Sequence, residues 1–161
     1  MPCDLILALD VPTREEAAPI LRQLRGSLRW VKLGLQMFTA YGPNYVREVA
    51  GMGFDVFLDL KLHDTPNTVE QGAAAVARLG VDFLTVHAFP KTMLAADRGR
   101  QGSGLRLLGV TVLTSDNAED LKASGYTVSP RVLVGQRAGT ASYHGMDGIV
   151  CSAHEAGMVR L

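Results

Sequence analysis

The sequence is poor in cysteine and has no excess of charge of either sign. Only two of its 161 residues are cysteines, Cys3 and Cys151, and without a CxxC pair they are too few for the disulfide framework of a small secreted domain. The 16 basic and 16 acidic residues cancel, so no basic field favours binding to nucleic acid or to an anionic membrane. We therefore expect a cytoplasmic protein whose ligands are small molecules.

Long apolar runs are missing as well. The longest near the start, residues 5–9, is far shorter than the roughly 20 residues of a membrane-spanning helix, and Asp4 precedes it where a signal peptide carries Lys or Arg. We expect neither a membrane span nor export. The chain is 47% hydrophobic and 20% charged, without a low-complexity linker or a shift in composition. Residues 1–161 are therefore expected to form a single domain.

Six short apolar runs alternate with segments of helical periodicity, which is the pattern of βα units around a parallel sheet. The expected strands are 5–10, 30–34, 56–62, 82–88, 107–113 and 147–152. The first five recur at intervals of roughly 25 residues, which suits one strand, one helix and two short loops. The sequence therefore predicts an α/β fold.

Helices are expected between these strands. One covers 13–24, where a threonine and a glutamate three positions apart fit a capping box, a second begins near Pro43, and a third covers 66–79. The pattern weakens toward the C-terminus, because segment 132–146, where another helix is expected, contains three glycines. The glycine-rich segment 99–104 follows no clear strand and is expected to be an exposed loop.

Two charged residues interrupt the apolar run 56–62. Side chains alternate between the two faces of a strand, so Asp59 and Lys61 point the same way, while the leucines between and beside them point toward the covering helices. In a closed parallel barrel, the inward face at the carboxyl ends of the strands forms the floor of the active site. Asp64 lies on the loop that follows.

The same alternation places Asp10 and Lys32 at the ends of the first two strands, facing inward. Taken alone, each is more commonly a solvated side chain, or a helix cap in the case of Asp10. Together with Asp59 and Lys61 they would form an array of alternating charge. Burying one unpaired charge costs several kcal/mol, so such an array is one of few ways in which these side chains could share a protein interior.

Five segments in this order resemble the bacterial orotidine 5′-phosphate decarboxylases: ALDV at 8–11, VKLG at 31–34, FLDLKLHDTPNTV at 57–69, VTVLTS at 110–115 and DGIVCS at 147–152. The LDLK strand with its DxKxxD pattern is the specific element. The ALD and VKxG elements are weak singly and gain weight from their order and spacing.

This resemblance implies a (β/α)8 TIM barrel that forms a homodimer with shared active sites. It implies conversion of orotidine 5′-monophosphate to uridine 5′-monophosphate and CO2 in pyrimidine biosynthesis, without a metal or an organic cofactor. About six βα units of such a barrel are present, and the family's main phosphate-binding loops belong to the last two. We therefore expect a C-terminally incomplete barrel that lacks this phosphate grip.

The resemblance also implies catalytic roles for four residues. Lys61 would protonate the ring carbon that loses CO2, and Asp59 would lie beside the substrate carboxylate. Lys32 would brace the charge array. Asp64 would reach into the active site of the partner subunit.

Further residues are implied to contact the substrate together with these. Asp10 and Lys32 would bond to the ribose hydroxyls, and Thr114 to the pyrimidine edge. Thr65 would act across the dimer, and Thr68 on the same segment would also contact the substrate.

Two alternatives stay open. Related barrels with a similar DxK strand act on sugar phosphates with a magnesium ion, and they carry an acidic ligand on the second strand where this chain has Lys32. A lysine at that position argues against the metal. The second alternative is a barrel that binds nucleotides without turning them over.

Overall fold

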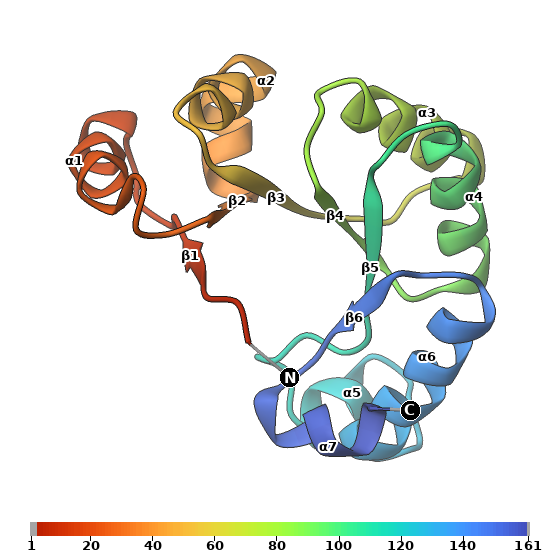
Figure 1. Ribbon diagram of the computed structural model, residues 1–161. Coiled ribbons are helices and arrows are strands. Elements are labelled where there is room, and N and C mark those ends of the chain that lie inside the picture. Colours follow the sequence, from red (N-terminus) through yellow and green to blue (C-terminus); the bar gives the residue numbers. More distant parts are fainter. Residues whose placement is uncertain (1–2, 161) are drawn as a thin grey trace.

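A computed structural model describes residues 3–160 as one curved parallel sheet with helices along its outer side. The strands are β1 (Ile6–Ala8), β2 (Trp30–Gly34), β3 (Asp55–Leu62), β4 (Phe83–His87), β5 (Arg106–Val110) and β6 (Gly148–Val150). They pair in sequence order, each parallel to the next. Within the described residues, β1 and β6 each have one neighbour only, and Figure 1 shows the ring open between them.

Helices separate the strands. They are α1 (Arg14–Leu24), α2 (Leu35–Gly51), α3 (Pro66–Ala77), α4 (Pro90–Arg100), α5 (Ala118–Ala123), α6 (Pro130–Tyr143) and α7 (Ala156–Val159), with a 3-10 turn over Ala153–Glu155. The predicted α/β class with six βα units is confirmed. Among residues 3–160, no helix has the length and apolar character needed to cross a membrane.

Two helices differ from the sequence-based expectation. α2 begins directly after β2, and a kink at Gly42, with φ 66° and ψ −165°, separates its first part from a second part that starts at Pro43 as predicted. α4 fills the place of the helix expected between the fourth and fifth strands, whose bounds the sequence did not predict, and it includes the first two residues of segment 99–104. The remainder, 101–104, is an exposed turn. The weak segment near the C-terminus does form a helix, α6, which the Ser129 hydroxyl caps.

The main core lies between the outer face of the sheet and the helices. Leu58 is wholly buried there, and Leu60 and Leu62 pack against the same cluster, as strand alternation predicts. The fully buried large side chains are Leu9, Leu21, Val31, Leu33, Met37, Val46, Val49, Val56, Leu58, Leu84, Met93 and Leu107. The inner face is consequently free to carry polar groups.

Three of the turns that lead into strands share a Gly-X-Asp sequence, at 53–55, 80–82 and 145–147. Each glycine has a positive φ (95°, 73° and 72°), a conformation that ends the preceding helix at little steric cost. The aspartates of the second and third turns accept hydrogen bonds from the N–H groups of Val56 and Leu107 on the neighbouring strands. These turns fix the strands at the end of the sheet opposite the strand carboxyl ends.

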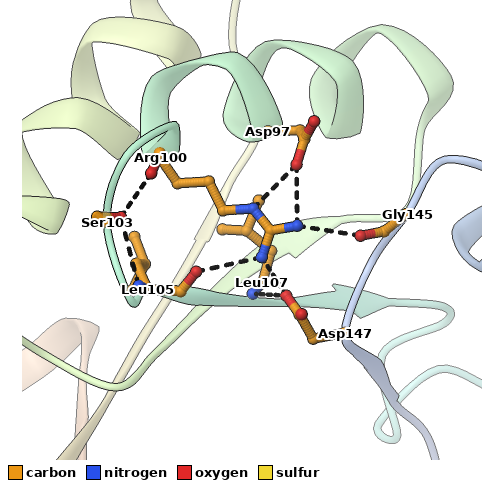
Figure 2. A network of polar contacts seen from close by, with 7 residues as sticks. All are labelled: Asp97, Arg100, Ser103, Leu105, Leu107, Gly145 and Asp147. Atoms are coloured by element: carbon orange, nitrogen blue, oxygen red, sulfur yellow. Dashed lines mark hydrogen bonds and ion pairs between the residues drawn. The ribbon is translucent and has the colours of Figure 1, made fainter.

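Arg100 strengthens the last of these turns (Figure 2). Its guanidinium donates to the carboxylates of Asp97 and Asp147 and to the carbonyls of Leu105 and Gly145. Only 16% of the Arg100 side chain is exposed. The guanidinium therefore ties α4 to the entries of β5 and β6, on the side of the sheet away from the strand carboxyl ends.

Candidate active site

Four charged side chains lie in a row across the carboxyl ends of β1, β2 and β3. Nζ of Lys32 lies 3.5 Å from Oδ2 of Asp10 and 3.3 Å from Oδ2 of Asp59. Nζ of Lys61 lies 2.9 Å from Oδ1 of Asp59. Negative and positive charges alternate along the row, as the sequence pattern predicts. We call these four residues the charge array.

Asp59 is the least exposed member of the charge array, with 11% of its side chain accessible. Burial raises the pKa of its carboxyl, but hydrogen bonds from Lys61 and Thr85 and the charges of Lys32 and Lys61 outweigh this, so the pKa lies below its ordinary value of 3.8. Asp59 is therefore ionised at neutral pH. Lys61 is more exposed, at 37%, which leaves its ammonium open to a ligand.

β3 is irregular where it carries the charge array. Leu58 pairs with Leu84 of β4 and Leu62 pairs with Val86. Between these two pairs β3 therefore advances by four residues and β4 by only two. Lys61 has a φ of 50°, in the left-handed region that residues other than glycine rarely occupy. The alternation of side chains predicted the right direction for Asp59 and Lys61 but did not predict this bulge. Bulges are over-represented beside active sites.

Thr85 of β4 is a member of the site that the sequence did not single out. Its hydroxyl donates to Oδ1 of Asp59 and accepts from the backbone N–H of Lys61, both at 2.8 Å. The residue is fully buried. The alternation that places Asp59 inward would also have placed Thr85 inward, but a threonine in a strand carries no distinctive signal.

The charge array borders a cavity of about 470 Å³. Its lining consists of Asp10, Lys32, Gly34, Leu35, Asp59, Leu60, Lys61, His87 and Leu113. Gly34 gives the array room, since a Cβ there would lie 3.1 Å from Oδ1 of Asp10 and 3.7 Å from Nζ of Lys32. The lining of the cavity thus combines charged groups with leucines, as the lining of small-molecule sites usually does.

Two histidines lie beside the cavity, of which His87 lines it. The His63 ring stacks on Phe89 with centroids 4.5 Å apart, and its Nδ1 lies 2.9 Å from Oγ1 of Thr92. Burial lowers the pKa of His87, and the nearby His63, Arg137 and Lys61 side chains lower it further. His87 is therefore neutral at pH 7 and adds no charge to the site.

The remaining predicted site residues lie outside the charge array. Asp64, Thr65 and Thr68 are exposed at the start of α3, where Asp64 accepts from the Thr65 N–H and the two threonine hydroxyls lie 3.0 Å apart. Thr114 is exposed beyond β5. None of the four lines the cavity of the described chain. They are free to meet a ligand or a second subunit.

The sequence model of one protein family, described as "Orotidine 5'-phosphate decarboxylase / HUMPS family", matches residues 4–160. The chain belongs to this family. A protein named orotidine 5′-phosphate decarboxylase from Afipia carboxidovorans is 48% identical over 156 residues, which are 97% of this chain and 66% of that protein. One of the same name from Opitutus terrae is 46% identical, over 99% of this chain and 71% of that protein.

Two solved structures share the fold. An uncharacterized conserved protein from Geobacillus kaustophilus has a TM-score of 0.90 at 38% identity, over 96% of this chain and 76% of that one. An orotidine 5′-phosphate decarboxylase from Lactobacillus acidophilus has a TM-score of 0.89 at 34% identity, over 97% and 74%. The six βα units are therefore part of a (β/α)8 barrel. The chain spans about two thirds of the length of the first of these relatives and about three quarters of the two solved chains.

No three His, Cys, Asp or Glu side chains within residues 3–160 lie in an arrangement that could hold a metal ion. Asp10 and Asp59, the acidic members of the charge array, are instead bridged by Lys32.

Proposed function

We propose that this site decarboxylates orotidine 5′-monophosphate, with Lys61 as the proton donor. The observation that carries the proposal is the Lys61 ammonium, bonded to Asp59 and partly open to the cavity. Membership of the family and the names of the relatives support the same reaction.

The reaction explains why an ammonium is needed at this point. Loss of CO2 leaves a carbanion in the plane of the pyrimidine ring, which has little resonance stabilisation. A fixed positive charge beside that carbon stabilises the transition state more than the substrate, and this difference accelerates the step. Lys61 is held by Asp59 before the substrate arrives, so little reorganisation is required. It then transfers a proton to the same carbon.

The other members of the charge array are proposed to orient the substrate. Asp59 is placed next to the carboxylate that leaves, and Asp10 and Lys32 bond to the ribose hydroxyls. Lys32 also helps to fix Asp59 and Asp10 relative to each other, because its Nζ lies near both aspartates. Thr114 is proposed to contact the pyrimidine edge from the loop after β5.

A second set of residues is proposed to act across a homodimer. Asp64, Thr65 and Thr68 are exposed beside the carboxyl end of β3, where a second subunit could receive them. In this proposal each active site contains residues of two chains. The reaction uses no metal or organic cofactor, belongs to pyrimidine biosynthesis in the cytoplasm, and residues 1–161 act as one domain.

The magnesium-dependent alternative fits the charges less well. A divalent ion needs the carboxylates of the site as ligands. Here Asp10 and Asp59 both lie within 3.5 Å of the Lys32 ammonium, and Asp59 also pairs with Lys61, so two cations already balance the two carboxylates. A metal would have to displace or repel these lysines.

The proposal is tested by incubating the purified chain with orotidine 5′-monophosphate and following both products. We expect uridine 5′-monophosphate and CO2 in equal amounts, without added metal and in the presence of a chelator. Calorimetric binding of uridine 5′-monophosphate with no release of CO2 would instead support a nucleotide-binding protein.

A further inference from the structure

We propose that Thr85 is a positioning residue, whose hydroxyl holds the Asp59 carboxylate and the Lys61 backbone in the arrangement that the charge array requires. Neither residue is a sequence neighbour of Thr85, which reaches them from the adjacent strand. The inference concerns how the array is built, and only its consequence for turnover rests on the proposed function.

The hydrogen bonds of Thr85 have fixed directions. The Lys61 N–H can only donate, and the ionised Asp59 carboxylate can only accept. The single hydroxyl hydrogen therefore belongs to Asp59, and an oxygen lone pair receives the Lys61 N–H. Both distances are 2.8 Å, so one buried oxygen links the Asp59 carboxylate to the backbone of Lys61, the residue whose ammonium forms the 2.9 Å ion pair with that carboxylate.

The backbone of Lys61 needs such a partner. Its φ of 50° is unfavourable for a side chain with a Cβ, and the pairing of β3 with β4 is shifted between Leu58 and Leu62. A regular strand would offer its N–H to a carbonyl of the neighbouring strand. Here the hydroxyl of Thr85 takes the place of that carbonyl, and the conformation that aims Lys61 at Asp59 is thereby supported.

Packing alone does not require a hydroxyl at position 85. Thr85 lies between Leu84 and Val86 on a strand segment that is fully buried. Valine has nearly the same shape and suits a strand equally well, whereas a buried hydroxyl costs free energy unless it is bonded. Both hydrogen-bonding capacities of Thr85 are used, and both are used on the charge array.

The test compares Thr85→Ser with Thr85→Ala, which both lose the methyl group and differ only in the hydroxyl. Thr85→Val is the isosteric third variant. Thr111→Val is the matched control, because Thr111 is also fully buried and its hydroxyl donates to the carbonyl of Val150, away from the array. Two quantities are measured by NMR on the ligand-free protein: the titration of the Asp59 carboxyl and the hydrogen exchange of the Lys61 amide.

The Ala and Val variants are expected to raise the pKa of Asp59 and to speed exchange of the Lys61 amide by about tenfold, in line with the loss of one hydrogen bond. The Ser variant and Thr111→Val should match the wild type in both. The proposal is overturned if Ala and Ser behave alike, or if Thr111→Val shifts the same two signals. The comparison of Thr85→Ser with Thr85→Ala tests the role of the hydroxyl even if Thr85→Val does not fold.

The consequence for catalysis is measured separately. If the proposed function holds, Thr85→Ala lowers kcat more than it raises KM, and Thr85→Ser restores kcat. A wild-type chain without decarboxylase activity would refute the proposed function while leaving the two NMR results as the test of Thr85. Normal kcat in Thr85→Ala, together with altered NMR signals, would refute the catalytic consequence alone.

Discussion

Nζ of Lys61 lies 2.9 Å from each carboxylate oxygen of Asp59, two residues earlier on the same strand. A regular strand separates such neighbours along its axis, and here a bulge and a left-handed backbone conformation bring them together. Asp59 is also close to Lys32, so one carboxylate serves two ammonium groups. The charge of Asp59 is therefore central to the stability of the site.

The stability contributed by Asp59 should depend on pH in a defined direction. Its folded-state pKa lies below 3.8, so the ionised carboxylate stabilises the fold fully above that ordinary value and loses the effect as the pH falls through the lowered pKa. Urea unfolding of the wild type and Asp59→Asn at pH 7 and below measures this. The free energy of unfolding of the wild type should exceed that of the variant most near neutral pH, and this difference should shrink below pH 3.8. Parallel curves would contradict the assignment.

Replacing Gly34 should impair the site without unfolding the protein. In Gly34→Ala, the new methyl lies 3.1 Å from Oδ1 of Asp10, whose exposed side chain can move away at little cost to the fold. Asp10 then leaves Lys32. We expect the Kd for uridine 5′-monophosphate to rise about tenfold, as for the loss of one charged hydrogen bond.

Gly135→Ala is the control for this variant, because Gly135 lies on α6 with open space around it. It should leave the affinity unchanged. Calorimetric titration of both variants with the nucleotide makes the comparison. Equal affinities for the two would show that the room beside Asp10 is not needed.

The Arg100 guanidinium should matter for stability and not for the reaction. Arg100→Met removes a largely buried cation, leaves Asp147 without its charged partner and takes the guanidinium donor from the carbonyls of Leu105 and Gly145, at a cost of about 2 kcal/mol or more. Arg98→Met, two residues away, breaks an exposed pair with Glu70 and should cost less than about 1 kcal/mol. Urea unfolding distinguishes the two. Similar losses in the free energy of unfolding would mean that the network in Figure 2 stabilises the fold no more than an exposed ion pair does.

The proposed sharing of active sites can be tested by mixing subunits. Asp64→Ala and Lys61→Ala should each be inactive alone. If Asp64 acts in the site of its partner, a mixed dimer has one site with both changes and one intact site, so an equal mixture should recover about a quarter of the wild-type rate. Activity is measured after the two variants have been exchanged under mild denaturation. A mixture no more active than its components would place Asp64 in the site of its own chain.

The charge array could be predicted from the sequence for two reasons: its residues follow the periodicity of a strand, and burying charged side chains costs free energy unless they are paired. Charges at Asp59 and Lys61 in an apolar run must share a face, and Lys32 and Asp10 come near the carboxyl ends of the two preceding apolar runs. The sequence motif around Asp59 then pointed to the family. The alternation of side chains along each strand was enough to predict that charged residues of neighbouring strands face the same side of the sheet.

Other features depend on contacts that no local pattern reveals. The first part of α2 follows β2 without a side-chain cap, so Pro43 was the earliest visible helix signal. The bulge in β3 arises from pairing with β4, and the Lys61 conformation depends on it. Thr85 acquires its role from residues on the neighbouring strand. Each of these is a tertiary effect that overrides local preference.

The central claim is that Lys61 supplies the charge and the proton for decarboxylation. The most direct measurement is the rate of CO2 release from orotidine 5′-monophosphate by the wild type and by Lys61→Ala, with Lys122→Ala, an exposed lysine on α5, as the control. We expect Lys122→Ala to match the wild type and Lys61→Ala to retain its fold by circular dichroism with less than about 1% of the rate. A folded Lys61→Ala protein that works faster than this would contradict the role assigned to Lys61.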